Sequence, residues 1–308
     1  MTMGKVLVCD PIHEDGIRML RAAKLQVDCR AGISHDELLR VVEDYDAIIV
    51  RSRTKVGKDV LRAAKGLKVI GRAGVGVDNI DVEEAIKHGI EVETSSSAPI
   101  ASVAELVFGL MIGLARSIPR ADRLMKEGKW AKKELMGTQL QGKTIGIVGL
   151  GRIGRAVGKR ARAFGMRVLV RTRHPNRKMD ALRELDAEVV SLEELLRRSD
   201  FVTLHVPLTE ETYHMIGEGE LRLMKRTAYL INTSRGGVVD TRALIEALRG
   251  GWIAGAALDV YEKEPPDDPA LVGMPNVICT PHIGSQTVEA QRACATIIAK
   301  KVIEALRG

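Results

Sequence analysis

Short runs of β-branched and aliphatic residues alternate with helix-length amphipathic segments along the whole chain. This alternation is typical of an α/β protein. The first group of predicted strands covers 5–9, 46–50, 67–71 and 89–93. A long helix over about 102–116 and a polar stretch to 142 follow. The second group of predicted strands covers 144–149, 166–170, 200–206, 228–232, 253–260 and 276–280.

The strands divide into two groups, which predicts two domains. Near-continuous apolar runs such as TIGIV and AYLI suit central parallel strands that are buried on both faces, and parallel pairing needs helical crossovers. The expected fold is α/β with two doubly wound parallel sheets, a Rossmann-type domain over 99–286 and a smaller flavodoxin-like domain over 1–98. The last helical segment, 287–308, has no following strand, and we expect it to pack back on the smaller domain.

Composition fits a globular chain with an aliphatic core, because hydrophobic residues make up 45%, charged residues 28% and aromatic residues only 3%. The most apolar run, Leu106–Ala115, is about half as long as a membrane helix, and the N-terminus lacks the apolar stretch of a secretory signal. We therefore expect a cytoplasmic protein with no membrane partner. The four cysteines show no paired spacing, which predicts buried reduced thiols, no disulfide framework and no metal site.

The formal net charge of +7 comes from one segment. Ten Lys or Arg residues and no Asp or Glu stand between Arg152 and Lys178. A nucleic-acid binder usually adds stacking aromatic residues or a recognition helix, and this stretch has one aromatic, Phe164. The charge therefore favours a small anionic ligand over nucleic acid.

A glycine-rich loop joins a predicted strand to a predicted helix. The strand over 144–148 runs into Gly149-Leu-Gly151-Arg-Ile-Gly154, and a helix follows to about Phe164. The first glycine permits a tight turn, the second lets the backbone approach a pyrophosphate, and the third allows close packing of helix on strand. The helix N-terminus adds free N–H groups. The pattern predicts a dinucleotide-binding domain over 99–286.

The end of the next strand departs from the usual pattern. An NAD enzyme carries an Asp or Glu there that binds the ribose 2′-hydroxyl, whereas this chain has Arg171-Thr172-Arg173. Two guanidinium groups can form charge-assisted hydrogen bonds to a 2′-phosphate, which favours NADP. Two alternatives remain: the arginines belong to a solvated basic face and NAD binds through its pyrophosphate, or both cofactors are used.

Three further segments carry candidate chemistry, and each follows a predicted strand: 232–237, 259–265 and 280–284. Loops at the carboxyl ends of parallel strands line one crevice, so these residues can meet at one ligand. An Arg grips a carboxylate with two hydrogen bonds, a His exchanges a proton near neutral pH, and a carboxylate orients that His. Together they indicate a 2-hydroxy acid site in the cleft between the two domains.

With the glycine loop, these segments resemble the D-isomer-specific 2-hydroxyacid dehydrogenase family over nearly the full chain. The resemblance implies that Arg235 binds the substrate carboxylate and keto oxygen, His282 is the acid/base, and Glu264 partners His282. Asp259 is similar to the residue that holds the nicotinamide carboxamide. The cofactor set implied by motif and resemblance is Gly149, Gly151, Arg152, Ile153, Gly154, Arg171, Thr172, Arg173, His205, Val206, Pro207, Thr233, Ser234, Asp259 and Gly284.

Within this family, segments 51–55, 71–79 and 130–138 resemble the phosphoglycerate dehydrogenase branch. The implied activity is oxidation of D-3-phosphoglycerate to 3-phosphohydroxypyruvate in serine biosynthesis, in a homodimer that makes contact through the 106–115 helix and the arm to 142. A phosphate plus a carboxylate carries about three negative charges and needs several cations. The substrate set is Arg51, Arg72, Gly74, Val75, Gly76 and Lys132. The alternatives are an NADPH-dependent glyoxylate or hydroxypyruvate reductase and, more remotely, a dinucleotide-binding co-repressor scaffold.

Overall fold

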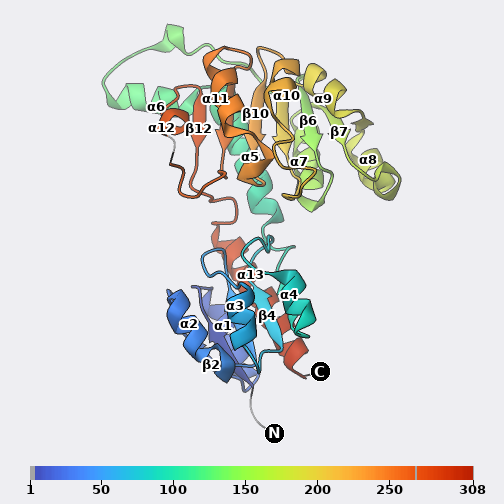
Figure 1. Cartoon of the computed structure of the whole chain (residues 1–308). Helices are drawn as coiled ribbons and strands as arrows, with labels where there is room; N and C mark the ends of the chain where they lie inside the picture. The colour runs from blue at the N-terminus through green and yellow to red at the C-terminus, as the bar shows by residue number, and fades with distance from the viewer. Residues whose placement is uncertain (1–3, 268, 308) are drawn as a thin grey trace. The chain divides into compact units, whose positions relative to one another are not determined.

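The computed structural model of the chain describes residues 4–267 and 269–307. The chain forms two compact units, one from 1–100 together with 285–308 and the other from 101–284. Figure 1 shows both units as helices around a central sheet. The assignment of substrate binding to unit 1 and of dinucleotide binding to unit 2 stays a prediction.

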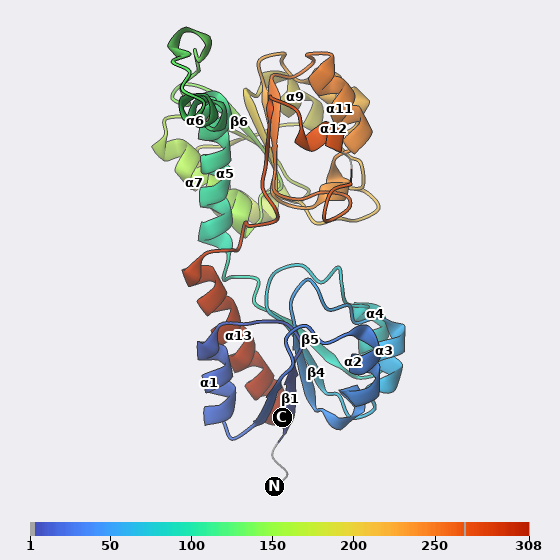
Figure 2. The same ribbon diagram turned by 90° about the vertical axis from the view of Figure 1, so that its left-hand side faces the viewer.

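Unit 1 is built on a five-stranded parallel sheet with the strand order β2-β1-β3-β4-β5. This is the flavodoxin-like order expected of the smaller domain. Helices α1 and α13 pack side by side against one face of the sheet (Figure 2). The elements are β1 (Lys5–Val8), α1 (Glu14–Ala22), β2 (Gln26–Cys29), α2 (His35–Val41), η1 (Val42–Asp44), β3 (Ala47–Val50), α3 (Lys58–Ala63), β4 (Val69–Arg72), α4 (Val82–Lys87), β5 (Glu91–Thr94) and α13 (Val288–Arg307).

Unit 2 is built on a seven-stranded parallel sheet with the order β12-β11-β10-β9-β6-β7-β8. Its elements up to β8 are α5 (Ile100–Ala115), α6 (Ile118–Lys126), η2 (Lys132–Glu134), β6 (Thr144–Val148), α7 (Arg152–Ala163), β7 (Arg167–Arg171), η3 (Pro175–Lys178), α8 (Met179–Leu185) and β8 (Glu188–Val189). The others are α9 (Leu192–Arg198), β9 (Phe201–Leu204), α10 (Glu218–Leu223), β10 (Tyr229–Asn232), η4 (Gly236–Val238), α11 (Thr241–Arg249), β11 (Gly255–Leu258), α12 (Pro269–Val272) and β12 (Val277–Cys279).

The expected α/β fold with two doubly wound sheets is confirmed. The central strands β3, β6 and β9 are buried at every position, as their apolar runs predict. The pattern missed two strands at sheet edges, β2 and β8, because they are short, lack a continuous apolar run and have no buried residue. The expectation of buried thiols is wrong for Cys29, which lies on edge strand β2 and is exposed.

Helix α5 is a core element of unit 2. Val107, Leu110, Met111 and Leu114 are buried against side chains of the sheet and of α7. Most apolar side chains of α5 are therefore covered within unit 2, and contact of the 106–115 helix with a second copy stays a prediction. By contrast, apolar side chains of the following arm, Trp130 and Met136, are 79% and 92% exposed.

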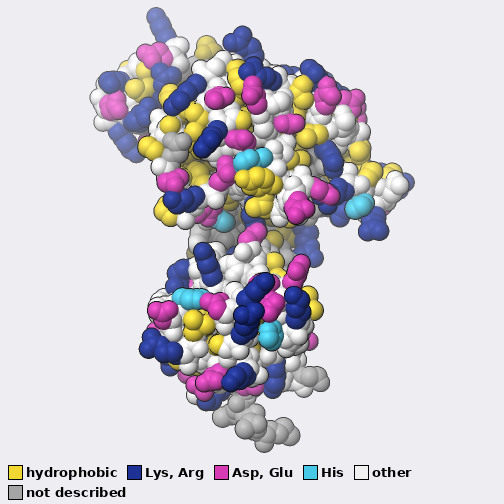
Figure 3. All heavy atoms as spheres, in the orientation of Figure 1, with side chains coloured by type: hydrophobic (Ala, Val, Ile, Leu, Met, Phe, Trp, Pro, Cys, Tyr) yellow, Lys and Arg dark blue, Asp and Glu magenta, His cyan; other side chains and the backbone are white. Residues whose placement is uncertain are grey.

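Charges of both signs are intermingled over the surface. Figure 3 shows Lys and Arg next to Asp and Glu across the face drawn, without a continuous basic area there. Among the described residues, no single helix has the length and apolar character to cross a membrane; only the bent pair α5 and α6 reaches that composition together. Within 4–267 and 269–307, no three His, Cys, Asp or Glu side chains are grouped as metal ligands.

Candidate active site

The predicted site residues of unit 2 gather at one edge of its sheet. All seven strands are parallel, so the segments that follow β6, β7, β9, β10, β11 and β12 leave the sheet at the same edge. The glycine loop, the arginine pair, His205, Arg235, Glu264 and His282 stand on these segments. Lys132 does not join them within its own unit, because η2 precedes the amino end of β6 (Figure 1).

The glycine loop has the geometry that its motif requires. Gly149 has φ +100°, and a Cβ there would lie 2.5 Å from the carbonyl oxygen of His205. A Cβ at Gly154 would lie 2.2 Å from the carbonyl oxygen of Gly149, so the third glycine lets α7 pack against the loop. Side chains at either position would force the loop apart.

Open space and an unpaired donor beside this loop suit a dinucleotide. Gly151 caps α7, and no atom lies within 4 Å of the position a Cβ would take there. The first N–H groups of a helix can bind a pyrophosphate from such a position. At the end of β10, the buried hydroxyl of Thr233 has no hydrogen-bond partner among the described residues. The residues present therefore fit a dinucleotide cofactor.

His205, which directly follows β9, is a half-buried neutral histidine. Burial lowers its pKa to about 4, and its Nε2 lies 3.0 Å from the hydroxyl of Thr203. A group with this pKa does not carry a proton near neutral pH, so His205 is not suited to acid/base work.

The arginine pair at the end of β7 lies in two different environments. Arg171 is half-buried at the last position of the strand, and its carbonyl accepts a hydrogen bond from the N–H of Gly149. Arg173 is exposed and forms an ion pair with Glu211 from the loop that follows β9. The sequence did not single out Glu211, because its loop is distant from Arg173 along the chain.

Arg235 stands on a turn that is held by a buried asparagine. Asn232, 1% exposed, donates from Nδ2 to the carbonyl of Arg235 at 2.9 Å. Its Oδ1 accepts from both the N–H and the hydroxyl of Ser234. Arg235 itself donates to the carbonyl of Ser234 at 2.7 Å. Asn232 therefore fixes the backbone from which the guanidinium projects.

Glu264 and His282 form a pair. Oε2 of Glu264 lies 2.8 Å from Nδ1 of His282, and both side chains are partly open to solvent. His282 has φ +53°, a left-handed conformation that is uncommon for a residue other than glycine. Nε2 of His282 has no recorded partner within 4–267 and 269–307, so this nitrogen is the one left to meet a ligand.

The loop that carries His282 is anchored by Asp259. This carboxylate is 1% exposed and accepts from the hydroxyl of Thr280 at 2.6 Å and from the N–H groups of Ile283 and Gly284 at 2.8 Å. Both oxygens therefore bind the histidine loop. The anchoring contacts account for a buried carboxylate at this position without a ligand.

Tyr261 connects the two strands that carry the pair, and it was not among the predicted site residues. Its hydroxyl donates to the carbonyls of Leu258 at 3.2 Å and Thr280 at 3.0 Å. Its N–H donates to Oε1 of Glu264 at 3.2 Å. Burial raises the pKa of Tyr261, which keeps its hydroxyl a donor. In the sequence, the only indication that Tyr261 belongs to the site is its position between Asp259 and Glu264.

In unit 1, Arg51 and Arg72 stand at the carboxyl ends of the neighbouring strands β3 and β4. Asp10 and Asn79 hold the main chain of Arg51: its N–H donates to Asp10 at 2.6 Å, and its carbonyl accepts from Asn79 at 2.8 Å. The guanidinium of Arg72 lies over Gly74, where a Cβ would collide with it. Arg51 and the 72–76 turn are thus brought together at one sheet edge.

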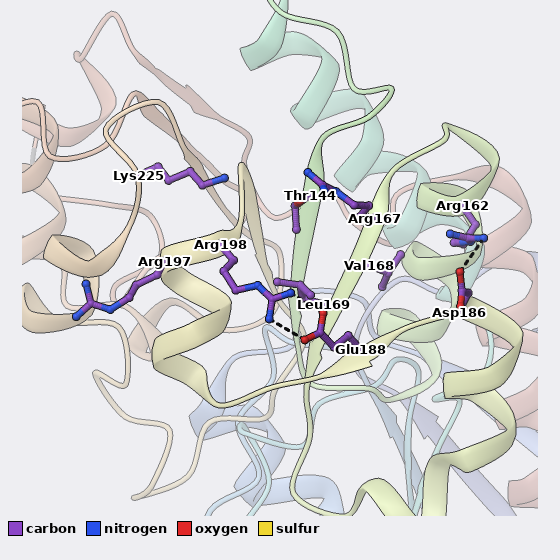
Figure 4. A pocket seen from close by; sticks show the side chains of 10 residues that line it. All are labelled: Thr144, Arg162, Arg167, Val168, Leu169, Asp186, Glu188, Arg197, Arg198 and Lys225. Carbon is purple, nitrogen blue, oxygen red and sulfur yellow. Dashed lines mark hydrogen bonds and ion pairs between the residues drawn. The ribbon is translucent and has the colours of Figure 1, made fainter.

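A separate pocket lies at the opposite edge of the sheet in unit 2, with a volume of about 510 Å³ (Figure 4). None of the predicted site residues lines it. Its cations are largely neutralised, since Arg198 pairs with Glu188 and Arg162 with Asp186. Helices α7 and α9 end here, and their carbonyl ends attract basic side chains. The basic lining therefore has a structural cause.

Comparisons with known proteins agree with this description. The family model for the D-isomer specific 2-hydroxyacid dehydrogenase, NAD binding domain, matches residues 108–284. A D-3-phosphoglycerate dehydrogenase of Methanocaldococcus jannaschii is 49% identical over 99% of this chain and 58% of its own length. A glyoxylate reductase of Thermococcus litoralis is 47% identical over 99% of this chain and 94% of its own. Among solved structures, the TT0316 protein of Thermus thermophilus has a TM-score of 0.91 and 39% identity, covering 99% and 97% of the two chains.

The fold and the glycine loop define an α/β protein with a dinucleotide-binding type of unit and a second, flavodoxin-like unit. The chain belongs to the D-isomer-specific 2-hydroxyacid dehydrogenase family, as its motifs predict. It spans 58% of the length of the two phosphoglycerate dehydrogenases to which it is 49% and 47% identical.

Proposed function

We propose that this protein is an NAD(P)-dependent oxidoreductase that transfers hydride between a nicotinamide cofactor and a D-2-hydroxy acid. The observation that carries the proposal is the Glu264–His282 pair, 2.8 Å apart, at the same sheet edge as the glycine loop. An imidazole with a carboxylate on one nitrogen and an open second nitrogen suits proton exchange with a hydroxyl.

Each residue has a distinct role in this proposal. A bound nicotinamide would accept the hydride, with its electron pair, from C2 of the hydroxy acid. In the oxidative direction, Nε2 of His282 takes the proton of the C2 hydroxyl. Glu264 stabilises the imidazolium that forms. Arg235 holds the carboxylate and the developing keto oxygen through charge-assisted hydrogen bonds. Asn232, Asp259 and Tyr261 keep these three side chains in position.

NADP is the proposed preferred cofactor. Arg171 and Arg173 stand where NAD enzymes carry a ribose-binding acid, and their guanidinium groups can form charge-assisted hydrogen bonds to a 2′-phosphate. NAD still has the glycine loop and the N-terminus of α7, so use of both cofactors is the alternative.

The proposed substrate is D-3-phosphoglycerate, oxidised to 3-phosphohydroxypyruvate. Arg51 and Arg72 at neighbouring strand ends supply cations suited to a phosphorylated acid. The second candidate is reduction of glyoxylate or hydroxypyruvate. The glyoxylate reductase of Thermococcus litoralis favours it, because the likeness covers 94% of that protein.

A homodimer is also proposed, through the 106–115 helix and the arm to 142. Trp130 and Met136 project from this arm and expose large apolar surfaces, which a second copy of the chain would bury. Lys132 lies on the same arm. In this proposal, Lys132 contacts the substrate across the interface between the two copies. Light scattering coupled to size-exclusion chromatography tests this: a monomeric mass at micromolar concentration would contradict it.

A panel of substrates and cofactors tests the proposed activity. Phosphohydroxypyruvate, hydroxypyruvate and glyoxylate are each assayed with NADH and with NADPH, and the expected best combination is phosphohydroxypyruvate with NADPH. Fast turnover of glyoxylate or hydroxypyruvate alone would favour the reductase. Cofactor binding with no turnover of any of the three would support the co-repressor scaffold and overturn the enzymatic proposal.

A further inference from the structure

We propose that Glu211 sets the choice between NAD and NADP by holding Arg173 in an ion pair that a 2′-phosphate must break. This inference rests on the proposed function, because it concerns the cofactor of that same site. The ion pair between Arg173 and Glu211 is the observation from which it starts.

The order of the strands places this pair over the glycine loop. β9 and β7 lie on either side of β6, which runs into Gly149. Glu211 comes from the loop after β9 and Arg173 from the segment after β7, so the two side chains meet across the end of β6. In glycine-loop folds, the residue at the end of the second strand faces the 2′ position of the adenosine ribose. Arg171 is the last residue of β7 and Arg173 follows two positions later. We infer that the Arg173–Glu211 pair lies next to the place of a 2′-phosphate.

The loop that carries Glu211 is a defined turn. The side-chain oxygen of Thr212 accepts from the N–H of Thr209 at 2.8 Å and donates to the carbonyl of Pro207 at 2.6 Å. The N–H groups of Thr212 and Tyr213 both donate to the carbonyl of Thr209. Thr212 is buried. These bonds fix the backbone on both sides of Glu211, so its side chain, which is 72% exposed, leaves the loop from a defined position within reach of Arg173.

Electrostatics give the pair its effect on cofactor choice. A 2′-phosphate carries about two negative charges, as other phosphomonoesters do near pH 7. Glu211 opposes its binding twice, because it neutralises one of the two cations and adds a negative charge close by. The 2′-hydroxyl of NAD carries no charge and is affected much less. Glu211 thus lowers the preference for NADP that Arg171 and Arg173 alone would produce.

Calorimetric binding of two adenosine fragments tests this without catalysis. Adenosine 2′,5′-bisphosphate carries the 2′-phosphate and 5′-AMP lacks it. For Glu211→Gln, the Kd of the bisphosphate is expected to fall by about three- to tenfold at low ionic strength, while the Kd of 5′-AMP stays within about twofold. The ratio of kcat/KM for NADPH over NADH should rise in the same proportion.

The matched control is Glu210→Gln, which removes the same charge one residue away. Glu210 has no ion pair recorded among the described residues, and little change is expected. In an Arg173→Gln background, Glu211→Gln should lose most of its effect. The inference would be overturned if Glu210→Gln and Glu211→Gln tightened binding of the bisphosphate equally. It would also be overturned if Glu211→Gln left that binding unchanged or weakened it. Each of these results would leave the proposed function intact. Failure of the wild-type protein to bind 5′-AMP or either dinucleotide would overturn both.

Discussion

Oε2 of Glu264 lies 2.8 Å from Nδ1 of His282, although the two residues are separated by 18 positions in the sequence. Asp259 and Tyr261, on the segment that follows β11, support this pair: Asp259 accepts from the N–H groups of the two residues after His282, and Tyr261 donates to Glu264 and to the carbonyl of Thr280. The arrangement differs from a surface ion pair because the backbone on both sides is fixed.

Replacing the imidazole is expected to remove most of the activity. In His282→Asn, the amide keeps a polar group but exchanges no proton, so kcat should fall by about 100- to 10,000-fold. Binding of the dinucleotide, measured by calorimetry, should stay close to that of the wild-type protein. The measurement is initial-rate kinetics of keto acid reduction.

A second histidine–carboxylate pair provides the control. Nε2 of His35 lies 2.6 Å from Oδ2 of Asp59 in unit 1, and both side chains are exposed. His35→Asn should leave kcat unchanged. If His282→Asn retains nearly the wild-type kcat, the role proposed for His282 is wrong.

Removing the hydroxyl oxygen of Tyr261 should distinguish a role in positioning the Glu264–His282 pair from a role in binding cofactor or keto acid. Tyr261→Phe leaves the carbonyls of Leu258 and Thr280 without this donor, which is expected to lower the free energy of unfolding by about 1–2 kcal/mol. Because the histidine loop loses an anchor, kcat should fall severalfold while the KM for the dinucleotide stays constant. Denaturant unfolding and steady-state kinetics measure the two effects.

Tyr213→Phe is the matched control, since that tyrosine is 57% exposed. Tyr213→Phe should change neither the free energy of unfolding nor kcat. An equal rise in the KM values of cofactor and keto acid with unchanged kcat would show that Tyr261 does not position the catalytic pair.

The sequence predicted what depends on local pattern. The Gly149–Gly154 loop is recognisable because its spacing, the preceding strand and the following helix are all contiguous. The edge strands β2 and β8 escaped because an edge strand has no need of a continuous apolar run. The burial of α5 against its own unit was also missed, since an apolar helix does not reveal which surface covers it.

Contacts between segments that are distant along the chain set a further limit on what can be predicted from the sequence. The hydroxyl of Tyr261 reaches Thr280 across 19 positions, and Arg173 meets Glu211 from another strand. Neither partner can be chosen from the sequence. Every residue offers a backbone carbonyl to a hydroxyl such as that of Tyr261, and any exposed acid near the sheet edge could pair with Arg173. The family resemblance identified the residues that face the ligand, but not those that hold them in place.

The proposal that the substrate carries a phosphate group can be tested by replacing Arg51. Arg51→Ala is expected to raise the KM for phosphohydroxypyruvate by about 10- to 100-fold, the effect of losing one charge-assisted hydrogen bond. The KM for glyoxylate should change by less than about twofold, because the backbone of Arg51 stays fixed by Asp10 and Asn79. Steady-state kinetics with both acids measure the difference.

Lys58→Ala, an exposed change in α3, controls for the loss of a positive charge from unit 1. Equal losses for both acids in Arg51→Ala would contradict a phosphate contact and would favour the glyoxylate reductase alternative.

The half-buried His205, which directly follows β9, should make the fold sensitive to acid. His205 has its pKa lowered to about 4 by burial, whereas an unfolded chain protonates it near its ordinary value of about 6.5. The unfolded state therefore binds more protons as the pH falls below about 6.5, and the native state loses stability until the pH reaches about 4. Above pH 7 the neutral form predominates in both states, and this contribution to the free energy of unfolding is constant.

Urea unfolding of the wild-type protein and His205→Gln at several pH values measures this contribution. The free energy of unfolding of the wild-type protein should fall by about 3 kcal/mol more than that of the variant between pH 7 and pH 4. Other titrating groups cancel in the difference between the two proteins. His88→Gln, on the exposed end of α4, should instead follow the wild-type curve. Parallel curves for the wild-type protein and His205→Gln would mean that His205 is hydrated in the native state, and it would then no longer be excluded as an acid/base group beside His282.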